Sequence, residues 1–202
     1  MSNAKGVFIA FEGGEAAGKS TQAALLATRL EAVLTREPGG TGLGESIRAI
    51  LLDPAQVQMS DRAEALLFAA ARAQLISEVI KPALALGRHV VTDRFAGSSF
   101  AYQAFGRGLE LAQVRALSAF AVDEIWPDLN VLIEVPPEVS RARMGQPDRL
   151  EAAGTQFHER VAEGFAQLAS AEPERWLRVS GLGSPQDVAA RVWQGVSERL
   201  SL

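Results

Sequence analysis

The chain of 202 residues is long enough to bury a substantial core, and its length fits one α/β domain. Its formal net charge of -4 gives no basic footprint for duplex DNA or RNA, and the absence of cysteine excludes disulfides and thiolate metal sites. No apolar run approaches the length of a membrane span, and the first residues lack the charged-then-apolar pattern of a secretory signal. We therefore expect a cytoplasmic protein with no membrane partner and no nucleic-acid partner.

The first predicted elements are a strand, a glycine-rich loop and a helix. Residues 7–11 form a short apolar run typical of a buried strand, which is predicted over residues 7–12, and residues 19–31 are predicted to form a helix with Leu25, Leu26 and Leu30 on one face. Between them, residues 13–20 fill every fixed position of the phosphate-binding loop pattern G-x-x-x-x-G-K-[ST]. In this order, several backbone N–H groups and the positive end of the helix point at one spot, where an anion can bind.

This loop predicts a site for a nucleoside triphosphate. Lys19 supplies a mobile cation for the phosphates, and Ser20 supplies a hydroxyl for a Mg²⁺ ion. The residues expected to bind the nucleotide are those of the loop and the residue after it: Gly13, Gly14, Glu15, Ala16, Ala17, Gly18, Lys19, Ser20 and Thr21.

The remaining elements alternate between strands and helices. Further strands are predicted over residues 32–36, 89–93, 129–135 and 176–179, and further helices over residues 43–52, 60–86, 111–121, 137–143, 155–171 and 185–200. Pro82 predicts a kink or an early end in the long helix. Alternation of this kind predicts an α/β fold of three layers, in which a five-stranded parallel sheet lies between helices as in P-loop NTPases, and which spans residues 1–202 as one domain.

Ligands of such sheets bind at the carboxyl ends of the strands, so the residues after each strand are candidate site residues. After the second strand, Arg36 precedes two glycines that allow close approach to an anion, although an ordinary turn also fits this segment. Asp93 ends the third strand, where an acidic residue can serve Mg²⁺, and Arg94 carries the planar fork that suits a phosphate. A surface salt bridge is the alternative for this pair.

Two further groups of residues are candidates for binding. Arg141, Arg143 and Arg149 repel one another unless an anion neutralises them, which favours a mobile lid over approximately residues 139–155; a solvated charged face is the alternative. Phe68 and Arg72 lie four residues apart on the long helix and share a face. Such a pair can stack on a base and hydrogen-bond its edge, although a core phenylalanine beside a surface arginine fits the same spacing.

Two opposed sets of cations favour phosphoryl transfer from a nucleoside triphosphate to a phosphorylated acceptor. A phosphate monoester has a second pKa of about 6 and is mostly a dianion at neutral pH, so it needs no general base. This agrees with a chain whose two histidines, His89 and His158, lie beside no motif and are interpreted as structural. A GTPase is disfavoured, since the chain has no N-K-x-D motif.

Five segments, taken together and in this order, resemble bacterial thymidylate kinases: residues 11–22, residues 35–41 (Thr-Arg-Glu-Pro-Gly-Gly-Thr), residues 63–74, residues 93–98 with 101–103 (Ala-Tyr-Gln), and residues 148–151 (Asp-Arg-Leu-Glu). The resemblance implies an ATP-dependent enzyme that transfers the γ-phosphoryl group of ATP to dTMP, giving dTDP and ADP for dTTP synthesis. It also implies Mg²⁺, a short arginine-bearing lid and a homodimer.

The resemblance further implies roles for individual residues. Glu15 would face the sugar 3′-hydroxyl, and Tyr102 would lie near the 2′ position and disfavour a ribonucleotide. Arg36 and Arg94 are implied to clamp the dTMP phosphate. The other residues implied to bind dTMP are Glu15 and Tyr102 near the sugar, Phe68 stacking on thymine, Arg72 donating to its exocyclic oxygen, and Ser98, Ser99 and Gln103 lining the base pocket. Those implied in catalysis are Lys19, Glu15, Arg94, Arg143 and Arg149, and those implied to serve Mg²⁺ are Ser20 and Asp93.

The chain departs from the family pattern at three positions. Ala16 stands where eukaryote-type enzymes carry an arginine, so the lid must supply the transition-state cation. Met144 precedes Gly145 where an arginine is usual, which leaves open which lid arginine makes that contact; we favour Arg149 and Arg143. Phe95 replaces a more usual tyrosine and loses a hydroxyl.

Two other functions fit parts of the pattern. A deoxynucleoside kinase shares the phosphate-binding loop and the Asp-Arg element, but its unphosphorylated acceptor needs a general base, for which Glu12 or Asp93 is available. A nucleotide-dependent partition or sensor protein would bind the nucleotide and hydrolyse it slowly, without an acceptor.

Overall fold

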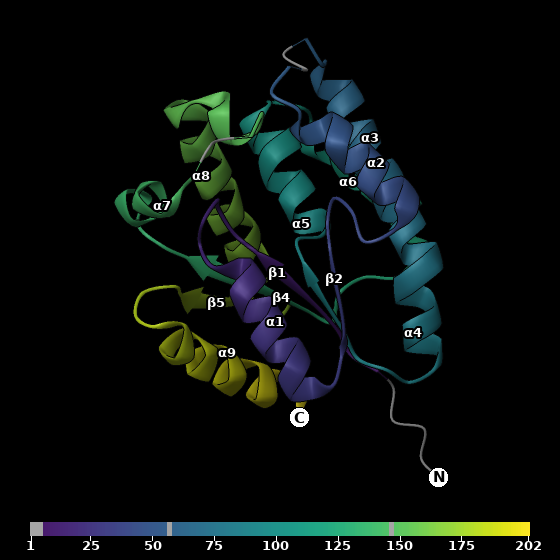
Figure 1. Cartoon of the computed structure of the whole chain (residues 1–202), viewed down its shortest axis with the longest axis vertical. Helices are drawn as coiled ribbons and strands as arrows, with labels where there is room; N and C mark the ends of the chain where they lie inside the picture. The colour runs from purple at the N-terminus through teal and green to yellow at the C-terminus, as the bar shows by residue number, and fades with distance from the viewer. Residues whose placement is uncertain (1–5, 56–57, 146–147) are drawn as a thin grey trace.

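The computed structural model describes residues 6–55, 58–145 and 148–202. Five strands form one sheet in which every neighbouring pair is parallel, in the order β2-β3-β1-β4-β5 (Figure 1). The strands are β1 (Phe8–Glu12), β2 (Val33–Arg36), β3 (Val90–Asp93), β4 (Leu129–Glu134) and β5 (Trp176–Ser180). The predicted five-stranded parallel sheet is confirmed, and each predicted strand boundary lies within one residue of the observed one.

Helices cover both faces of the sheet. In chain order they are α1 (Lys19–Leu30), α2 (Gly42–Leu52), α3 (Asp61–Leu75), η1 (Ile76–Ile80), α4 (Lys81–Ala85), α5 (Ala96–Ser99), η2 (Phe100–Gly106), α6 (Leu111–Val122), α7 (Pro137–Arg143), η3 (Glu151–Ala153), α8 (Thr155–Ala171) and α9 (Pro185–Leu200). Helices α1 and α9 pack on one face, while α6, α8, η1 and η2 pack on the other (Figure 1). Among the described residues, no helix is both long and apolar enough to cross a membrane.

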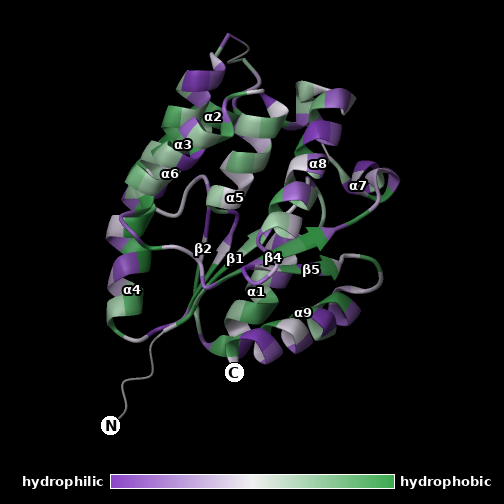
Figure 2. Cartoon of the chain, turned by 180° about the vertical axis from the view of Figure 1, so that it is seen from behind, coloured by the Kyte–Doolittle hydropathy of each residue, from purple (hydrophilic) through white to green (hydrophobic). Residues whose placement is uncertain are grey.

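The alternation of side chains along β1 explains why the sheet needs helices on both sides. Phe8 and Ala10 pack into the cluster formed with α6 and α8, whereas Ile9 and Phe11 pack into the cluster formed with α1 and α9. All residues of β1 are buried, as expected for a central strand of a parallel sheet. Figure 2 shows the strands largely in the hydrophobic colour, while the surrounding helices carry both colours.

The long helix predicted over residues 60–86 is present but not uniform. It contains the π-helical turn η1 directly before α4, whose second residue is Pro82. Proline lacks the N–H that would bond the carbonyl four residues earlier, and its ring pushes that carbonyl away. A wider turn at this point accommodates the proline without ending the helix.

The structure also contains a helical segment that the sequence did not predict. Residues 96–106 form α5 and η2, directly after β3. This segment carries glycine, serine and aromatic residues, which have weak intrinsic helix propensity, so local composition did not favour a helix. It is stabilised by burial, since Phe100, Ala101, Tyr102 and Ala104 lie in the main core.

The sheet register brings the candidate residues together. Asp93 at the end of β3 pairs with Phe11 of β1 on one side and with Arg36 of β2 on the other. The residues that follow these three strands therefore meet at one edge of the sheet.

Candidate active site

A cavity of about 480 Å³ opens at the carboxyl ends of β1, β2 and β3. Most of the predicted site residues line it: Glu15, Ala16, Gly18, Lys19, Ser20, Thr21, Arg36, Phe68, Arg72, Asp93, Arg94, Ser98, Ser99, Tyr102, Gln103 and Arg143. Residues that the sequence analysis did not assign also line it, among them Glu37, Arg48 and Glu151. Gly14 and Ala17 border a second cavity, of about 590 Å³, that lies between the phosphate-binding loop, α7 and α8.

The phosphate-binding loop has the backbone that its glycines allow. Gly13 and Gly18 have φ angles of 139° and 97°, and a Cβ on Gly13 would lie 2.4 Å from the carbonyl oxygen of Ile133. Lys19 is buried and its Nζ donates to the carbonyl oxygen of Gly14 at 2.5 Å. Burial and then the charge of Arg94 lower the pKa of Lys19 to about 8, which leaves it mostly protonated at neutral pH.

Ser20 and Asp93 form a pair suited to Mg²⁺. The hydroxyl of Ser20 donates to Asp93 Oδ2 at 2.5 Å. The other carboxylate oxygen, Oδ1, is buried and has no hydrogen-bond partner among the described residues. A hydroxyl and one carboxylate with a free lone pair fit an ion that takes its remaining ligands from water and from nucleotide phosphates. Among the described residues, no group of three or more His, Asp or Glu is placed to hold a metal ion.

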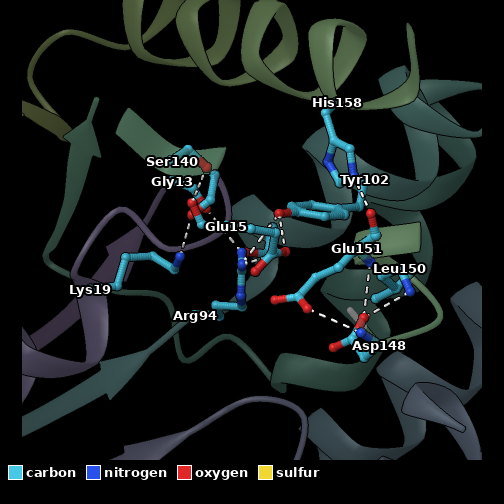
Figure 3. Close-up of polar contacts among 12 residues, drawn as sticks. Gly13, Glu15, Lys19, Arg94, Tyr102, Ser140, Asp148, Leu150, Glu151 and His158 are labelled. Carbon is cyan, nitrogen blue, oxygen red and sulfur yellow. Dashed lines mark hydrogen bonds and ion pairs between the residues drawn. The ribbon is translucent and has the colours of Figure 1, made fainter. Parts of the chain in front are cut away.

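Arg94 lies at the centre of the polar network in Figure 3. Its Nη1 donates to the carbonyl oxygen of Gly13 and to Ser98 Oγ, both at 3.0 Å, and its Nη2 donates to Glu15 Oε1 at 2.8 Å and to Tyr102 Oη at 3.2 Å. The side chain is 16% exposed, and the backbone has a φ of 72°, in the left-handed region. These contacts hold the guanidinium group against the phosphate-binding loop.

Glu15 is held as a carboxylate beside Arg94. Burial opposes its ionisation, but the charges of Arg94 and Lys19 outweigh burial and lower the pKa of Glu15 to about 2. The hydroxyl of Tyr102 donates to Glu15 at 2.5 Å, and burial raises the pKa of Tyr102 well above its ordinary value, so the phenol keeps its proton. Helix α7, which lies in the segment predicted to be a lid, contacts the same loop, because Ser140 Oγ donates to the backbone carbonyl of Glu15 at 2.7 Å (Figure 3).

Glu12 is linked to Arg94 through the hydroxyl of Ser98. It is fully buried at the end of β1 and accepts hydrogen bonds from the backbone N–H of Phe95 at 3.1 Å and from Ser98 Oγ at 2.6 Å. Burial raises the pKa of Glu12 to about 7. Its side chain lies against α5, since a Cβ on Gly97 would lie 2.6 Å from its Oε1.

Arg72 is buried, which rules out the surface arginine considered from the sequence. Its Nε and Nη2 donate to Glu37 Oε2 at 2.9 and 2.7 Å, Nη2 also donates to Ser99 Oγ at 2.9 Å, and Nη1 donates to Ser118 Oγ at 3.3 Å. These bonds use four of the five N–H groups of a guanidinium and leave one on Nη1. Phe68, one turn earlier, is 9% exposed and borders the cavity together with Arg72.

Two arginines of the β2–α2 region converge on the cavity. Arg36 is 54% exposed and pairs with Glu45 at 3.0 Å. Arg48 on α2 donates to the carbonyl oxygen of Pro38 at 2.9 Å, and burial and then the charge of Arg36 lower its pKa. Glu45, which pairs with Arg36, supplies negative charge beside both arginines. Arg48 was not predicted as a site residue, because its contact with Pro38, ten positions earlier, leaves no signal in a single sequence.

The three arginines after β4 do not act as one cluster in this structure. Arg143 lines the main cavity, and its Nη2 lies 3.5 Å from the carbonyl oxygen of Gly181. Arg141 lines the second cavity. Arg149 lines neither: its Nε donates to the carbonyl oxygen of Leu51 at 2.7 Å and its Nη1 pairs with Glu64 at 2.7 Å. Residues 146 and 147 of the predicted lid lie outside the described residues.

Comparisons with known proteins agree with this geometry. A sequence model of the thymidylate kinase family matches residues 11–192. The thymidylate kinase of Synechococcus sp. (strain JA-2-3B'a(2-13)) is 50% identical over 203 residues, which cover 97% of each chain, and that of Deinococcus radiodurans is 47% identical over 203 residues, covering 96% of this chain and 98% of its own. The crystal structure of thymidylate kinase from Ehrlichia chaffeensis matches with a TM-score of 0.78 and 29% identity, covering 95% of this chain and 98% of that one. The chain therefore belongs to the thymidylate kinase family.

Proposed function

We propose that this chain is an ATP-dependent dTMP kinase, which transfers the γ-phosphoryl group of ATP to dTMP and releases dTDP and ADP. The observation that carries the proposal is the shared cavity, which is lined by Lys19 and other residues of the phosphate-binding loop together with Arg94, Arg36 and Arg48. Two anions bound in one cavity can be placed for in-line transfer, which depends on positioning and charge neutralisation.

On the donor side, the loop from Gly13 to Thr21 would hold the β- and γ-phosphates of ATP. Lys19 would neutralise the negative charge on the oxygen atoms of the γ-phosphoryl group during transfer. Mg²⁺ held by Ser20 and Asp93 would neutralise the phosphate charges further. The buried, unpartnered Oδ1 of Asp93 supports this assignment.

On the acceptor side, Arg94, Arg36 and Arg48 would hold the dTMP phosphate. Arg94 pairs with Glu15 and Arg36 pairs with Glu45. The phosphate of dTMP would replace part of these ion pairs with its own oxygen atoms. Glu15, fixed by Tyr102, is then left to accept a hydrogen bond from the sugar 3′-hydroxyl, and the ring of Tyr102 would crowd a ribose 2′-hydroxyl.

The base would lie on Phe68, between the residues of the long helix and those of η2. The single remaining N–H of Arg72 would donate to the exocyclic oxygen of thymine, and Ser98, Ser99 and Gln103 would line the rest of the pocket. All of these residues border the cavity.

Among the lid arginines, we assign the contact with the transferred phosphoryl group to Arg143, since it is the one that lines the cavity. A catalytic role for Arg149 stays a prediction. No general base is needed, because a monoester phosphate with a second pKa of about 6 is mostly a dianion at neutral pH. The alternative deoxynucleoside kinase would need such a base, and Glu12 is fully buried and occupied by Phe95 and Ser98.

Coupled assays of ADP release decide this proposal. We expect turnover with dTMP, weaker turnover with dUMP, and none above background with thymidine. Uracil lacks only one methyl group, which is worth about 1–3 kcal/mol in a pocket, so some dUMP turnover is expected. Preference for thymidine would identify a nucleoside kinase, and ADP release without any acceptor would identify a nucleotide-dependent sensor.

We also propose a cytoplasmic homodimer, in which α2, α3 and α6 meet their counterparts. These helices lie side by side in both views (Figures 1 and 2) and carry exposed apolar side chains: Leu43 (52% exposed), Ile50 (46%), Leu66 (58%) and Phe120 (88%). Exposed apolar side chains on three neighbouring helices support an interface there. The cytoplasm is the proposed location because the two substrates, ATP and dTMP, are available there.

A further inference from the structure

Glu64 lies behind the cavity, in the first turn of α3, and has no part in the roles described above. Its side chain is 1% exposed. Oε1 accepts from Gln103 Nε2 at 2.9 Å and from Arg107 Nε at 3.2 Å. Oε2 accepts from Arg107 Nη2 at 2.9 Å and pairs with Arg149 Nη1 at 2.7 Å. One buried carboxylate thus joins α3, the end of η2 and the segment after α7.

This environment keeps Glu64 ionised. Burial alone would raise the pKa of Glu64, but hydrogen bonds from Arg107 and Gln103, together with the charge of Arg107, outweigh burial and lower it. A carboxylate has no proton to donate, so it can only accept hydrogen bonds. The side-chain group of Gln103 that contacts Glu64 must therefore be the NH₂ group, which can donate.

The side chain of Gln103 borders the cavity together with Phe68 and Arg72. An amide can turn either way in most settings, and its orientation follows from its hydrogen-bond partners. One of the two N–H groups of this NH₂ bonds Glu64, which fixes the side of the amide on which the carbonyl oxygen lies. That oxygen can only accept a hydrogen bond from a ligand.

We propose that Glu64 is a positioning residue that sets base specificity: it orients Gln103 so that the pocket selects a pyrimidine with an N–H at ring position 3. Thymine and uracil carry this N–H, whereas cytosine presents a lone pair there and would face the Gln103 oxygen with a second acceptor. The inference rests on the proposed function, since it names the contact that separates dTMP from dCMP. Arg107 and Arg149 contribute by keeping Glu64 ionised.

The test compares kcat/KM for dTMP and for dCMP in the wild-type enzyme and in Glu64→Gln. A glutamine at this position can donate or accept, so Gln103 is free to turn over. We expect the ratio of kcat/KM for dTMP to that for dCMP to fall on the order of 10-fold, with the KM for ATP within about threefold of wild type. Where dCMP turnover is too slow to measure, its inhibition constant against dTMP replaces it. The ratio does not fall to one, because Arg72 still favours an oxygen over an amino group.

Asp61→Asn is the matched control. It removes the same charge from the same cluster, since Asp61 Oδ1 lies 3.6 Å from Arg107 Nε, but the side chain is 49% exposed and makes no contact with Gln103. We expect the selectivity ratio to stay within about twofold of wild type. An unchanged ratio in Glu64→Gln would overturn the inference, whereas a wild-type enzyme inactive on dTMP would overturn the proposed function instead.

Thermal unfolding shows whether Glu64→Gln is folded at the assay temperature. If it is not, the orientation of the Gln103 amide is measured by nuclear magnetic resonance in the complex of the wild-type protein with dTMP. Nuclear Overhauser effects from the Gln103 NH₂ protons to the Glu64 side chain are the expected result. Effects from those protons to the thymine ring, in place of Glu64, would reject the orientation.

Discussion

Charged residues of the site are paired with one another. Arg94 lies on Glu15, Arg72 on Glu37 and Arg36 on Glu45. The first two pairs are largely buried, so their carboxylates keep the arginines in place and hydrogen-bonded, whereas the third is about half exposed and contributes little to stability. The buried pairs therefore act as a preformed frame, and the exposed Arg36 is the arginine most free to move to a phosphate.

Removing the amino group of Lys19 should strongly slow phosphoryl transfer. Lys19→Ala should lower kcat at least ~100-fold, because it deletes a cation aimed at the charge of the transferred phosphoryl group. The dTMP dissociation constant should change little, since the acceptor arginines remain. Steady-state kinetics with calorimetric dTMP binding check this, and an unchanged kcat would contradict the assigned role.

In the proposed mechanism Arg72 serves both base binding and stability, so its variants need to separate the two. Arg72→Ala leaves the buried Glu37 without its partner, which should cost about 3–5 kcal/mol of unfolding free energy, and it also deletes the thymine contact. The double variant Arg72→Met with Glu37→Gln should recover much of the stability but not the affinity for dTMP. Urea unfolding and dTMP titration are the measurements, and restored dTMP affinity in the double variant would argue against base recognition.

Glu12 should make stability depend on pH. Its pKa is about 7 in the fold against an ordinary 4.5, so the unfolded chain loses its proton first as the pH rises. The contribution of Glu12 is therefore fully present below pH 4.5 and is lost between pH 4.5 and pH 7. Relative to wild type, Glu12→Gln should gain about 2–3 kcal/mol of unfolding free energy over this window.

Denaturant unfolding at several pH values measures this difference. Glu15 does not confuse it, because its pKa is lowered to about 2 and its contribution is lost only as the pH falls below 4.5. A difference between wild type and Glu12→Gln that stays constant from pH 4.5 to pH 7.5 would show that Glu12 is not held protonated.

At the scale of elements, α7 presents its two arginines to different cavities. Arg143→Ala should lower kcat by on the order of 100-fold, since a donor aimed at the transferred group is worth about that much. Arg141→Ala, two residues away on the same short helix, is the control and should remain within about twofold of wild type. Single-turnover rates at saturating ATP and dTMP compare them, and equal losses in both variants would indicate a general effect of the charge on α7.

Strong local signals explain which elements could be predicted. The phosphate-binding loop, the apolar runs of the strands and the amphipathic α8 and α9 carry their structure in adjacent residues, and their positions are confirmed. The helical segment 96–106 could not be predicted, because its residues become helical through burial against α8 and α6 rather than through propensity.

Site residues follow the same division. Residues on a motif, such as Lys19 and Asp93, could be named from spacing alone. Glu37, Arg48 and Glu64 could not, because their significance comes from partners 10 to 39 positions away: Arg72 for Glu37, Pro38 for Arg48 and Gln103 for Glu64. A single sequence does not show such pairs.

For the whole molecule, the proposed homodimer is the main prediction. Phe120 on α6 is 88% exposed, which is unusual for a large aromatic side chain on an isolated subunit. Phe120→Glu should convert the dimer to a monomer by placing a charge in the interface, and Leu86→Glu, at an equally apolar and 76% exposed position on the far end of α4, should leave it intact. Light scattering at working concentration measures both, and a monomeric wild type would reject the dimer.

Asp93 and Arg94 are neighbours in the chain, yet in the proposed mechanism one serves the ion on the donor and the other grips the acceptor. A single peptide unit, turned by the φ of 72° at Arg94, therefore sets the spacing between the two reacting nucleotides. This separation is covalent and does not depend on how far the lid closes. Inserting one residue between them would uncouple the two halves of the reaction while leaving each nucleotide able to bind.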